Sequence, residues 1–117
     1  MGLGSFLSQL LGGGAGLSPA QVKERLQGDS QVQLIDVRSP QDYKEGYIKG
    51  SRLIPLPELP TRLREIKADR PVLLFCRSGM RSSNALSLLK NNGYTQVEQI
   101  SGGIMAWSMG GHPVETK

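Results

Sequence analysis

Two kinds of segment alternate along this chain. Short apolar runs with the length of buried strands occupy residues 32–37, 52–54, 72–75 and 96–100. The segments between them carry helix-start signals or apolar residues at helical spacing, which predicts helices over residues 18–28, 41–45, 59–66, 82–91 and 104–109. Strands that alternate with helices are typical of a mainly parallel sheet covered by helices on both faces. The pattern therefore predicts an α/β fold.

Local signals sharpen two of these helix boundaries. Ser18 is suited to cap the first helix, Pro19 occupies its first position, and Gln21 completes a capping box. Gly93 is suited to end the helix that precedes it, because glycine accepts a left-handed backbone at little steric cost.

The start of the chain differs in character from the remainder. Four apolar residues at helical spacing predict a short helix within residues 1–11, and the glycines that follow indicate a flexible linker. We therefore divide the chain into an N-terminal helix and linker, residues 1–16, and a single domain, residues 17–117. The short helix has no basic segment or cleavage site of a signal peptide. It either packs on the domain or docks on a partner or membrane surface, and its lack of Lys and Arg disfavours the membrane.

Composition narrows the range of functions. Hydrophobic residues make up 38% of the 117 residues, enough for one core, and no apolar stretch approaches the roughly 20 residues of a membrane-spanning helix. The net charge of +4 suits anionic substrates. Aromatic residues do not interleave with basic clusters, so we expect no nucleic-acid binding. We expect neither a metal nor another cofactor.

The chain has one cysteine, Cys76, which excludes an intramolecular disulfide and fits a reducing compartment, so we expect a cytoplasmic protein. Cys76 ends the most apolar strand, and parallel sheets bind ligands at this end of their strands. A structural alternative is a small buried hydrophobe. However, residues 77–82 read Arg-Ser-Gly-Met-Arg-Ser at a strand-to-helix junction, which is a poor place for an inert thiol.

The segment after Cys76 has the properties of an anion-binding loop. It comprises Arg77, Ser78, Gly79, Met80, Arg81 and Ser82. The two arginines supply positive charge, the following helix directs its N-terminus at the loop, and successive backbone amides can form an anion-binding nest. These features favour the thiolate, which is the reactive form of cysteine. They remove the need for a general base, so the single histidine, His112, is expected to be an ordinary surface residue.

Four segments of the chain together resemble the rhodanese homology domain over about residues 17–115. They are residues 34–38 (Leu-Ile-Asp-Val-Arg), 46–51 (Gly-Tyr-Ile, then Gly-Ser), 74–82 (Leu-Phe-Cys-Arg-Ser-Gly-Met-Arg-Ser) and 102–107 (Gly-Gly-Ile-Met-Ala-Trp). Each segment alone is a weak signal, but the combination is specific. Tyr47 departs from the family, in which many relatives have histidine at a position that is usually structural.

The resemblance implies a central, mainly parallel five-stranded sheet flanked by helices on both faces. It also implies a sulfurtransferase with a two-step cycle, in which Cys76 takes sulfane sulfur from a donor and then passes it, as a persulfide, to a nucleophilic acceptor. The loop amides and the flanking arginine would hold the donor anion and the persulfide. Asp36 and Arg38 would be supporting residues: Asp36 braces the active-site loop, or the two form an ion pair. Trp107 is expected in the core.

The charge of the loop bears on the donor. An arginine directly after the cysteine resembles loops that use thiosulfate, whereas loops of the Cys-Gly-Ser-Gly type go with mercaptopyruvate. We therefore expect thiosulfate, or an anionic small persulfide such as glutathione persulfide, as the donor. The acceptor would be a thiol, cyanide or a protein.

Three other functions remain as alternatives. Cysteine phosphatases use a similar cradle with five residues between cysteine and arginine, but only four separate Cys76 from Arg81, and the smaller ring favours sulfur. A persulfide carrier would use the same chemistry for a dedicated protein partner. A non-enzymatic rhodanese-like binding module would be marked by the absence of the cysteine, which is present here.

Overall fold

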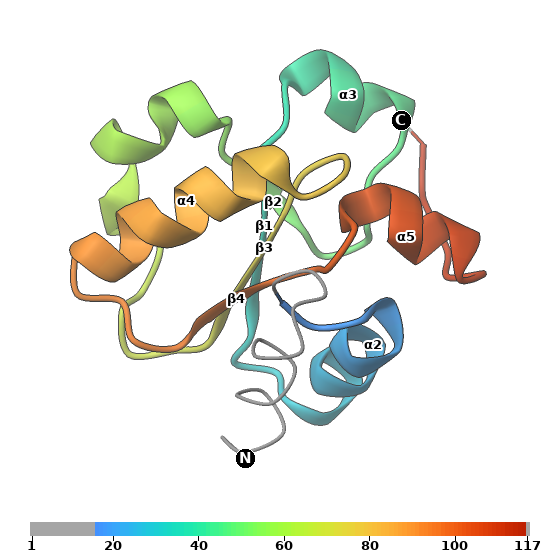
Figure 1. The fold of residues 1–117 in the computed structure, drawn as a ribbon, viewed down its shortest axis with the longest axis horizontal. Coiled ribbons are helices and arrows are strands. Elements are labelled where there is room, and N and C mark those ends of the chain that lie inside the picture. The colour runs from blue at the N-terminus through green and yellow to red at the C-terminus, as the bar shows by residue number, and fades with distance from the viewer. Residues whose placement is uncertain (1–15, 117) are drawn as a thin grey trace.

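The computed structural model describes residues 16–116, and a parallel sheet forms its centre (Figure 1). The strands are β1 (Gln33–Asp36), β2 (Arg52–Leu53), β3 (Val72–Phe75) and β4 (Val97–Gln99). Their order in the sheet is β2-β1-β3-β4, and every pairing is parallel. The carboxyl ends of β1 and β3 lie side by side, because Asp36 is the partner of Phe75.

Helices cover both faces of the sheet, as the sequence predicts. They are α2 (Pro19–Gly28), α3 (Pro40–Glu45), α4 (Met80–Asn91) and α5 (Gly103–Met109). Leu73 and Phe75 of β3 pack in one apolar cluster with Val22 of α2 and Trp107 of α5. The alternate residues of the same strand pack in a second cluster with α4. This alternation follows from the two-residue repeat of a strand, and it places the side chain of Cys76 on the α4 face.

The sheet has four strands in the described part of the chain, against five expected. At the edge beside β4, Leu17 makes a single parallel bridge with Ile100. Its amide donates to the Gln99 carbonyl at 2.8 Å, and its own carbonyl accepts from the Ser101 amide at 2.8 Å. One residue thus occupies the place of a further strand.

The helix predicted over residues 59–66 is wrong in type. The segment forms two 3₁₀ helices, η1 (Leu56–Thr61) and η2 (Leu63–Glu65), joined at Arg62. Prolines at 57 and 60 explain the difference, because proline has no amide hydrogen to donate and its ring disfavours a continuous α-helix. The apolar spacing was nevertheless informative: Leu59 and Ile66 are buried, and Leu63 packs against the same cluster.

Other local predictions are confirmed. Ser18 and Gln21 form the capping box of α2. Trp107 is 4% exposed, and its indole N–H donates to the Pro113 carbonyl at 2.8 Å. Tyr47 is a packing residue that stacks on Tyr43, with ring centroids 4.6 Å apart.

The helix predicted within residues 1–11 and almost all of the predicted glycine linker fall within residues 1–15, which lie outside the described residues. Within residues 16–116, no helix is both long and apolar enough to span a membrane.

Candidate active site

Cys76 follows the last residue of β3 and is 2% exposed. The chain then turns sharply through Gly79, whose φ of +119° lies in a region that side chains rarely adopt. Gly79 is also the N-cap of α4, which begins at Met80 and not at Ser82 as predicted. The turn therefore brings the first residues of a 12-residue helix directly over the thiol.

Backbone amides of this turn point at the sulfur. The Gly79 N–H donates to Cys76 Sγ at 3.0 Å and the Ser82 N–H donates at 3.3 Å. The Ser82 hydroxyl lies 3.6 Å from the same sulfur. These amide donors have the arrangement of the anion-binding nest that the sequence predicts after Cys76.

These contacts act on the acidity of the thiol. Burial by itself raises the pKa of Cys76, but hydrogen bonds from the Ser82 hydroxyl and from the amides of Ser82, Gly79 and Ser78 outweigh it. The pKa of Cys76 consequently lies below its ordinary value, which increases the fraction of reactive thiolate.

The two arginines of the loop do not act as expected. Arg81 turns toward α3, where its guanidinium is 3.7 Å from the Asp42 carboxylate, and its side chain is 49% exposed. Arg77 is exposed and lines a cavity beside the loop. The leading causes of the lowered pKa of Cys76 are hydrogen bonds from Ser82, Gly79 and Ser78, and neither arginine is among them. The sequence predicted roles for both the amides and the arginines, whereas hydrogen bonds to the sulfur are the leading causes in the structure.

A second glycine turn supports the loop from below. The Ile104 N–H donates to the Cys76 carbonyl at 2.9 Å, and the Met105 N–H donates to the Arg77 carbonyl at 3.1 Å. Gly103 has a φ of +64°, and a Cβ there would lie 2.5 Å from the Cys76 carbonyl oxygen. Only glycine fits this close approach. The sequence indicates Gly102 and Gly103 only as part of one segment of the family resemblance, and it does not predict their contact with the loop.

Asp36 and Arg38 form the ion pair that was one of the two expected arrangements. The Arg38 guanidinium donates to the Asp36 carboxylate at 2.8 Å, and the two residues are 6% and 0% exposed. Arg38 also donates to the Gly46 carbonyl at 2.6 Å and lies 5.8 Å from the Phe75 ring centroid. Asp36 therefore holds Arg38 in place at the end of β1, next to Phe75 of β3.

Gln99 is a polar residue of the site that the sequence analysis missed. It is 2% exposed on β4, and its amide faces Ser82 and Ser83 at the start of α4. Its Oε1 accepts from the Ser82 hydroxyl, and its Nε2 donates to Ser83 Oγ at 3.1 Å. A buried glutamine in a strand carries no local signal, because its partners lie 16 and 17 residues away.

The His112 ring is tilted against Trp107, with centroids 4.7 Å apart. Trp107 belongs to the apolar cluster with α2 and α5, whereas Cys76 belongs to the cluster with α4. In the described residues, no group of three or more His, Cys, Asp or Glu side chains is arranged to hold a metal ion.

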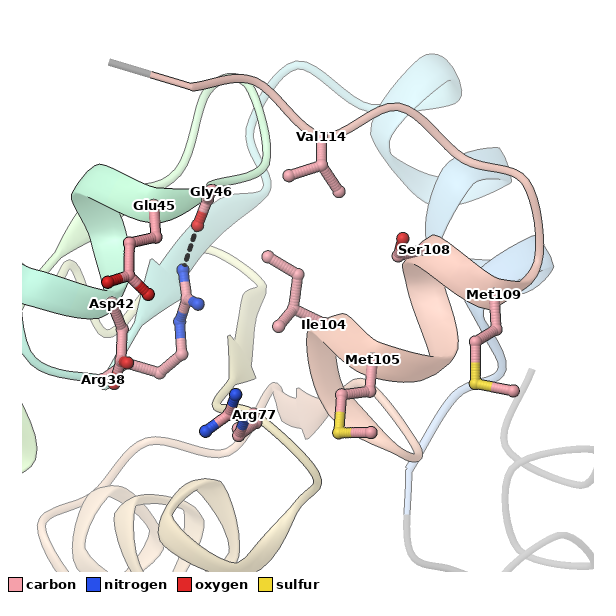
Figure 2. A pocket seen from close by; sticks show the side chains of 10 residues that line it. All are labelled: Arg38, Asp42, Glu45, Gly46, Arg77, Ile104, Met105, Ser108, Met109 and Val114. Atoms are coloured by element: carbon pink, nitrogen blue, oxygen red, sulfur yellow. Dashed lines mark hydrogen bonds between the residues drawn. The ribbon is translucent and has the colours of Figure 1, made fainter.

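A cavity of about 330 Å³ opens beside the loop, between α3 and α5 (Figure 2). Arg38, Asp42, Glu45 and Gly46 line one side, and Ile104, Met105, Ser108 and Met109 of α5 line the other. Arg77 lies at its edge and Val114 closes it from the C-terminal segment. The residue after the nucleophile thus belongs both to the loop and to the cavity.

Comparison with known proteins agrees with this geometry. The family model of the rhodanese-like domain matches residues 18–109. The chain belongs to this family. A sulfurtransferase of Allochromatium vinosum is 38% identical over 93 residues, which are 80% of this chain and 87% of that protein. YqhL of Bacillus subtilis, an uncharacterized protein, is 42% identical over 80 residues, or 68% of this chain and 64% of YqhL.

A solved rhodanese structure shows the same fold. The crystal structure of a rhodanese-related protein from Thermoplasma volcanium has a TM-score of 0.80 at 27% identity, and the match covers 88% of this chain and 99% of that one. Members of the rhodanese-like family that are sulfurtransferases act on sulfur donors and acceptors, so the relatives support a sulfur-transfer function.

Proposed function

We propose that this protein is a sulfurtransferase that carries sulfane sulfur as a persulfide on Cys76. In the first half of the cycle, the thiolate attacks the outer sulfur of thiosulfate; a sulfur–sulfur bond forms to Cys76 and sulfite leaves. In the second half, cyanide or a thiolate attacks the outer sulfur of the persulfide. The bond to Cys76 breaks, and the thiolate returns with its negative charge.

The observation that carries this proposal is the pair of amides on the sulfur. The Gly79 and Ser82 N–H groups donate to Cys76 Sγ at 3.0 and 3.3 Å. The same negative charge arrives with the thiolate, moves to the outer sulfur and returns, and fixed donors stabilise it at each stage without rearrangement. No step requires a general base, in keeping with the position of His112 against Trp107.

The donor that we propose is thiosulfate or an anionic small persulfide. Arg77 directly follows the nucleophile, is exposed, and has no ion-pair partner within residues 16–116. An unpaired cation at this position attracts an anionic donor. Arg81 contributes less to this attraction, because Asp42 already pairs with it.

The test combines two measurements. Wild-type protein incubated with thiosulfate should gain the mass of one sulfur atom, and cyanide should remove it as thiocyanate. Cys76→Ser should reduce thiocyanate release by about a thousandfold or more, because it removes the atom that carries the sulfur. His112→Ala is the control and should retain activity. Wild-type protein that never gains sulfur from thiosulfate or a small persulfide would refute the proposal.

A persulfide carrier for a protein partner is the second candidate. It is favoured by three exposed methionines around the loop and cavity: Met80, Met105 and Met109, which are 80%, 48% and 85% exposed. Exposed flexible apolar side chains are typical of surfaces that bind other proteins. Rapid discharge of the loaded protein by cyanide and small thiols would contradict a dedicated carrier, whereas persistence of the persulfide would support it.

A further inference from the structure

The cavity beside the loop has walls of opposite charge (Figure 2). Asp42 and Glu45 of α3 form an acidic side; Asp42 lies 3.7 Å from the Arg81 guanidinium, whereas Glu45 has no ion-pair partner among the described residues. Arg77 provides a cation that no carboxylate of the described chain pairs with. Ile104 and Met105 of α5 supply apolar surface opposite α3. A ligand that suits these walls needs an anionic group, a cationic group and a carbon body.

The acidic side keeps its charge. Burial by itself raises the pKa of Asp42, but hydrogen bonds from Ser39 and the charges of Arg38 and Arg81 outweigh burial and lower it. Arg38 is already bound to Asp36 and to the Gly46 carbonyl. The cation available to a ligand is therefore Arg77.

The size of the cavity exceeds what thiosulfate requires. A volume of about 330 Å³ lies at the lower end of small-molecule sites, which span about 300 to 1,000 Å³. Thiosulfate consists of a sulfane sulfur bonded to a sulfonate group. It has no carbon and no positive charge, so it makes no favourable contact with the apolar and acidic walls.

We propose that this cavity binds the organic part of a zwitterionic thiol, of the amino-acid or short-peptide class, that exchanges sulfur with Cys76. The carboxylate of the ligand faces Arg77, its ammonium group faces Asp42 and Glu45, and its carbon chain lies on Ile104 and Met105. This proposal rests on the proposed persulfide function and specifies the substrate class.

The exchange is balanced in both directions. The Cys76 thiolate attacks the outer sulfur of R–S–SH, a Cys76 persulfide forms, and RS⁻ leaves with the electron pair of the broken bond. In the reverse direction, RS⁻ attacks the outer sulfur of the Cys76 persulfide and releases the Cys76 thiolate. One cavity serves both directions, because donor and product share the same organic part.

The test uses protein loaded with sulfur from thiosulfate, discharged in single turnovers by cysteine, 3-mercaptopropionate or cysteamine. The last two lack the ammonium group and the carboxylate, respectively. Per unit of thiolate, cysteine should discharge the persulfide about fivefold faster than either analogue, the size expected of partly exposed ion pairs. Equal rates for the three thiols would overturn the proposal.

Two variants locate the effect. Ser108→Trp fills the cavity and should slow cysteine about tenfold while cyanide, which has no organic part, stays within about twofold. Ser87→Trp, on an exposed serine of α4, is the matched control and should change neither rate. Glu45→Gln should slow cysteine and cysteamine equally and spare 3-mercaptopropionate, with Glu24→Gln of α2 as its control.

These outcomes separate the two proposals. Protein that loads with sulfur and is discharged by cyanide, but does not distinguish the thiols, keeps the persulfide function and loses the cavity proposal. Protein that never loads with sulfur loses both.

A separate observation concerns the hydroxyl of Ser82, which has one hydrogen and three acceptors nearby. They are the Gly79 carbonyl at 3.2 Å, Cys76 Sγ at 3.6 Å and Gln99 Oε1, which accepts the shortest contact. With the Cys76 thiol protonated, the S–H donates to Ser82 Oγ and the Ser82 hydrogen goes to Gln99. The thiolate has no hydrogen to donate and requires the hydrogen of Ser82 for itself.

Gln99 can accommodate this change, because its amide has a donor end and an acceptor end. A half-turn brings Nε2 to Ser82 Oγ and Oε1 to Ser83 Oγ, which already lies 3.5 Å from Oε1. The Ser83 hydrogen then turns from the Gly79 carbonyl, its partner at 2.8 Å, to Oε1, and the Gly79 carbonyl keeps the Ser83 amide as its donor at 3.1 Å. Every buried donor and acceptor then stays bonded in both states.

We infer that Gln99 is a positioning residue whose amide reverses when Cys76 changes between its neutral and anionic forms, with Ser82 as the link. The charged side chains of the neighbouring elements are Arg77 and Arg81 of the loop and α4, Glu98 of β4, and the Asp36–Arg38 pair at the end of β1. The Gln99 amide bonds to Ser82 and Ser83, and Ser82 is the residue that contacts Cys76.

The test follows glutamine side-chain amide resonances by NMR as the pH is raised. The Gln99 amide should shift with the same midpoint as the alkylation rate of Cys76, and both Cys76→Ser and Ser82→Ala should abolish the shift. Gln33 is the matched control, since its amide is held at both ends by the Lys67 backbone, at 2.9 and 2.8 Å. A Gln99 resonance that does not follow Cys76 would overturn the inference.

Discussion

The ends of β1 and β3 are neighbours in the same sheet, but one holds a negative group with a charged partner and the other with uncharged hydrogen-bonding groups. At the end of β1, the Asp36 carboxylate is fully buried and held by the Arg38 guanidinium at 2.8 Å. At the end of β3, the Cys76 thiol is held only by amides and one hydroxyl. The two ends are joined by the hydrogen bond from the Val37 amide to the Phe75 carbonyl, at 3.0 Å.

The same edge of the sheet therefore holds a rigid ion pair at the end of β1 and a reactive sulfur at the end of β3. A buried ion pair has a permanent charge on each partner, and removing either partner is costly, so it suits a rigid support. Amide donors have no net charge, and a neutral sulfur still accepts their hydrogen bonds weakly, so they suit a sulfur whose charge comes and goes.

Removing the charge of Asp36 should cost the most stability. Asp36→Asn leaves Arg38 buried without a counter-ion and should lower the free energy of unfolding by about 3–5 kcal/mol, measured by urea denaturation. The control is Glu65→Gln, whose partly exposed pairs with Arg52 and Arg62 should contribute far less. Equal losses in the two variants would contradict the contrast between buried and exposed pairs.

Gly103→Ala should disturb the end of β3 while leaving the Cys76 side chain in the sequence. Its Cβ would lie 2.4 Å from the Arg77 carbonyl oxygen and 2.5 Å from that of Cys76, at a φ of +64°. We expect a loss of about 2–4 kcal/mol, from the left-handed backbone and the collision together, and lower sulfur transfer.

Gly50→Ala provides the matched comparison. Gly50 has a φ of +88°, but a Cβ there meets no atom within 4 Å. It should cost only about 1–2 kcal/mol, from the backbone alone, and leave transfer intact. If both variants were equally stable and active, Gly103 would have no part in shaping the loop.

Stability should depend on pH through Cys76. The pKa of this thiol is lower in the folded protein than in the unfolded chain, so between the two pKa values the unfolded state binds more protons. The contribution is fully present above the unfolded pKa and is lost as the pH falls through the folded pKa. The difference in unfolding free energy between wild type and Cys76→Ser should therefore grow as the pH rises toward the ordinary thiol pKa of about 8.5, and level off above it. A stability difference that stays constant or decreases as the pH rises would contradict this prediction.

Met80→Ala should have the smallest effect. The Met80 side chain is 80% exposed, and the loop requires only the backbone at this position. We expect a change of less than about 0.5 kcal/mol in unfolding free energy and little change in thiocyanate release. A large loss of activity with small acceptors would show that the side chain itself takes part in transfer.

The sequence by itself was sufficient for the alternation of strands and helices, the position of Cys76 and the amide nest. Local physics determines these features: Ser18 and Gln21 cap their own helix, and the nest forms within the six residues that follow Cys76. Prolines within residues 55–60 already disfavour a regular α-helix there, but the helix was predicted from the apolar spacing alone.

Only the tertiary structure decided which distant groups meet. It directed Arg81 to Asp42, placed Gly103 under the Cys76 carbonyl, and brought Gln99 to Ser82. Each of these contacts joins segments that are separated in the chain and become neighbours only when the parallel strands assemble. A residue pattern reports the conformation of its own segment, whereas the direction of a guanidinium or the partner of a buried amide depends on the packing of the others.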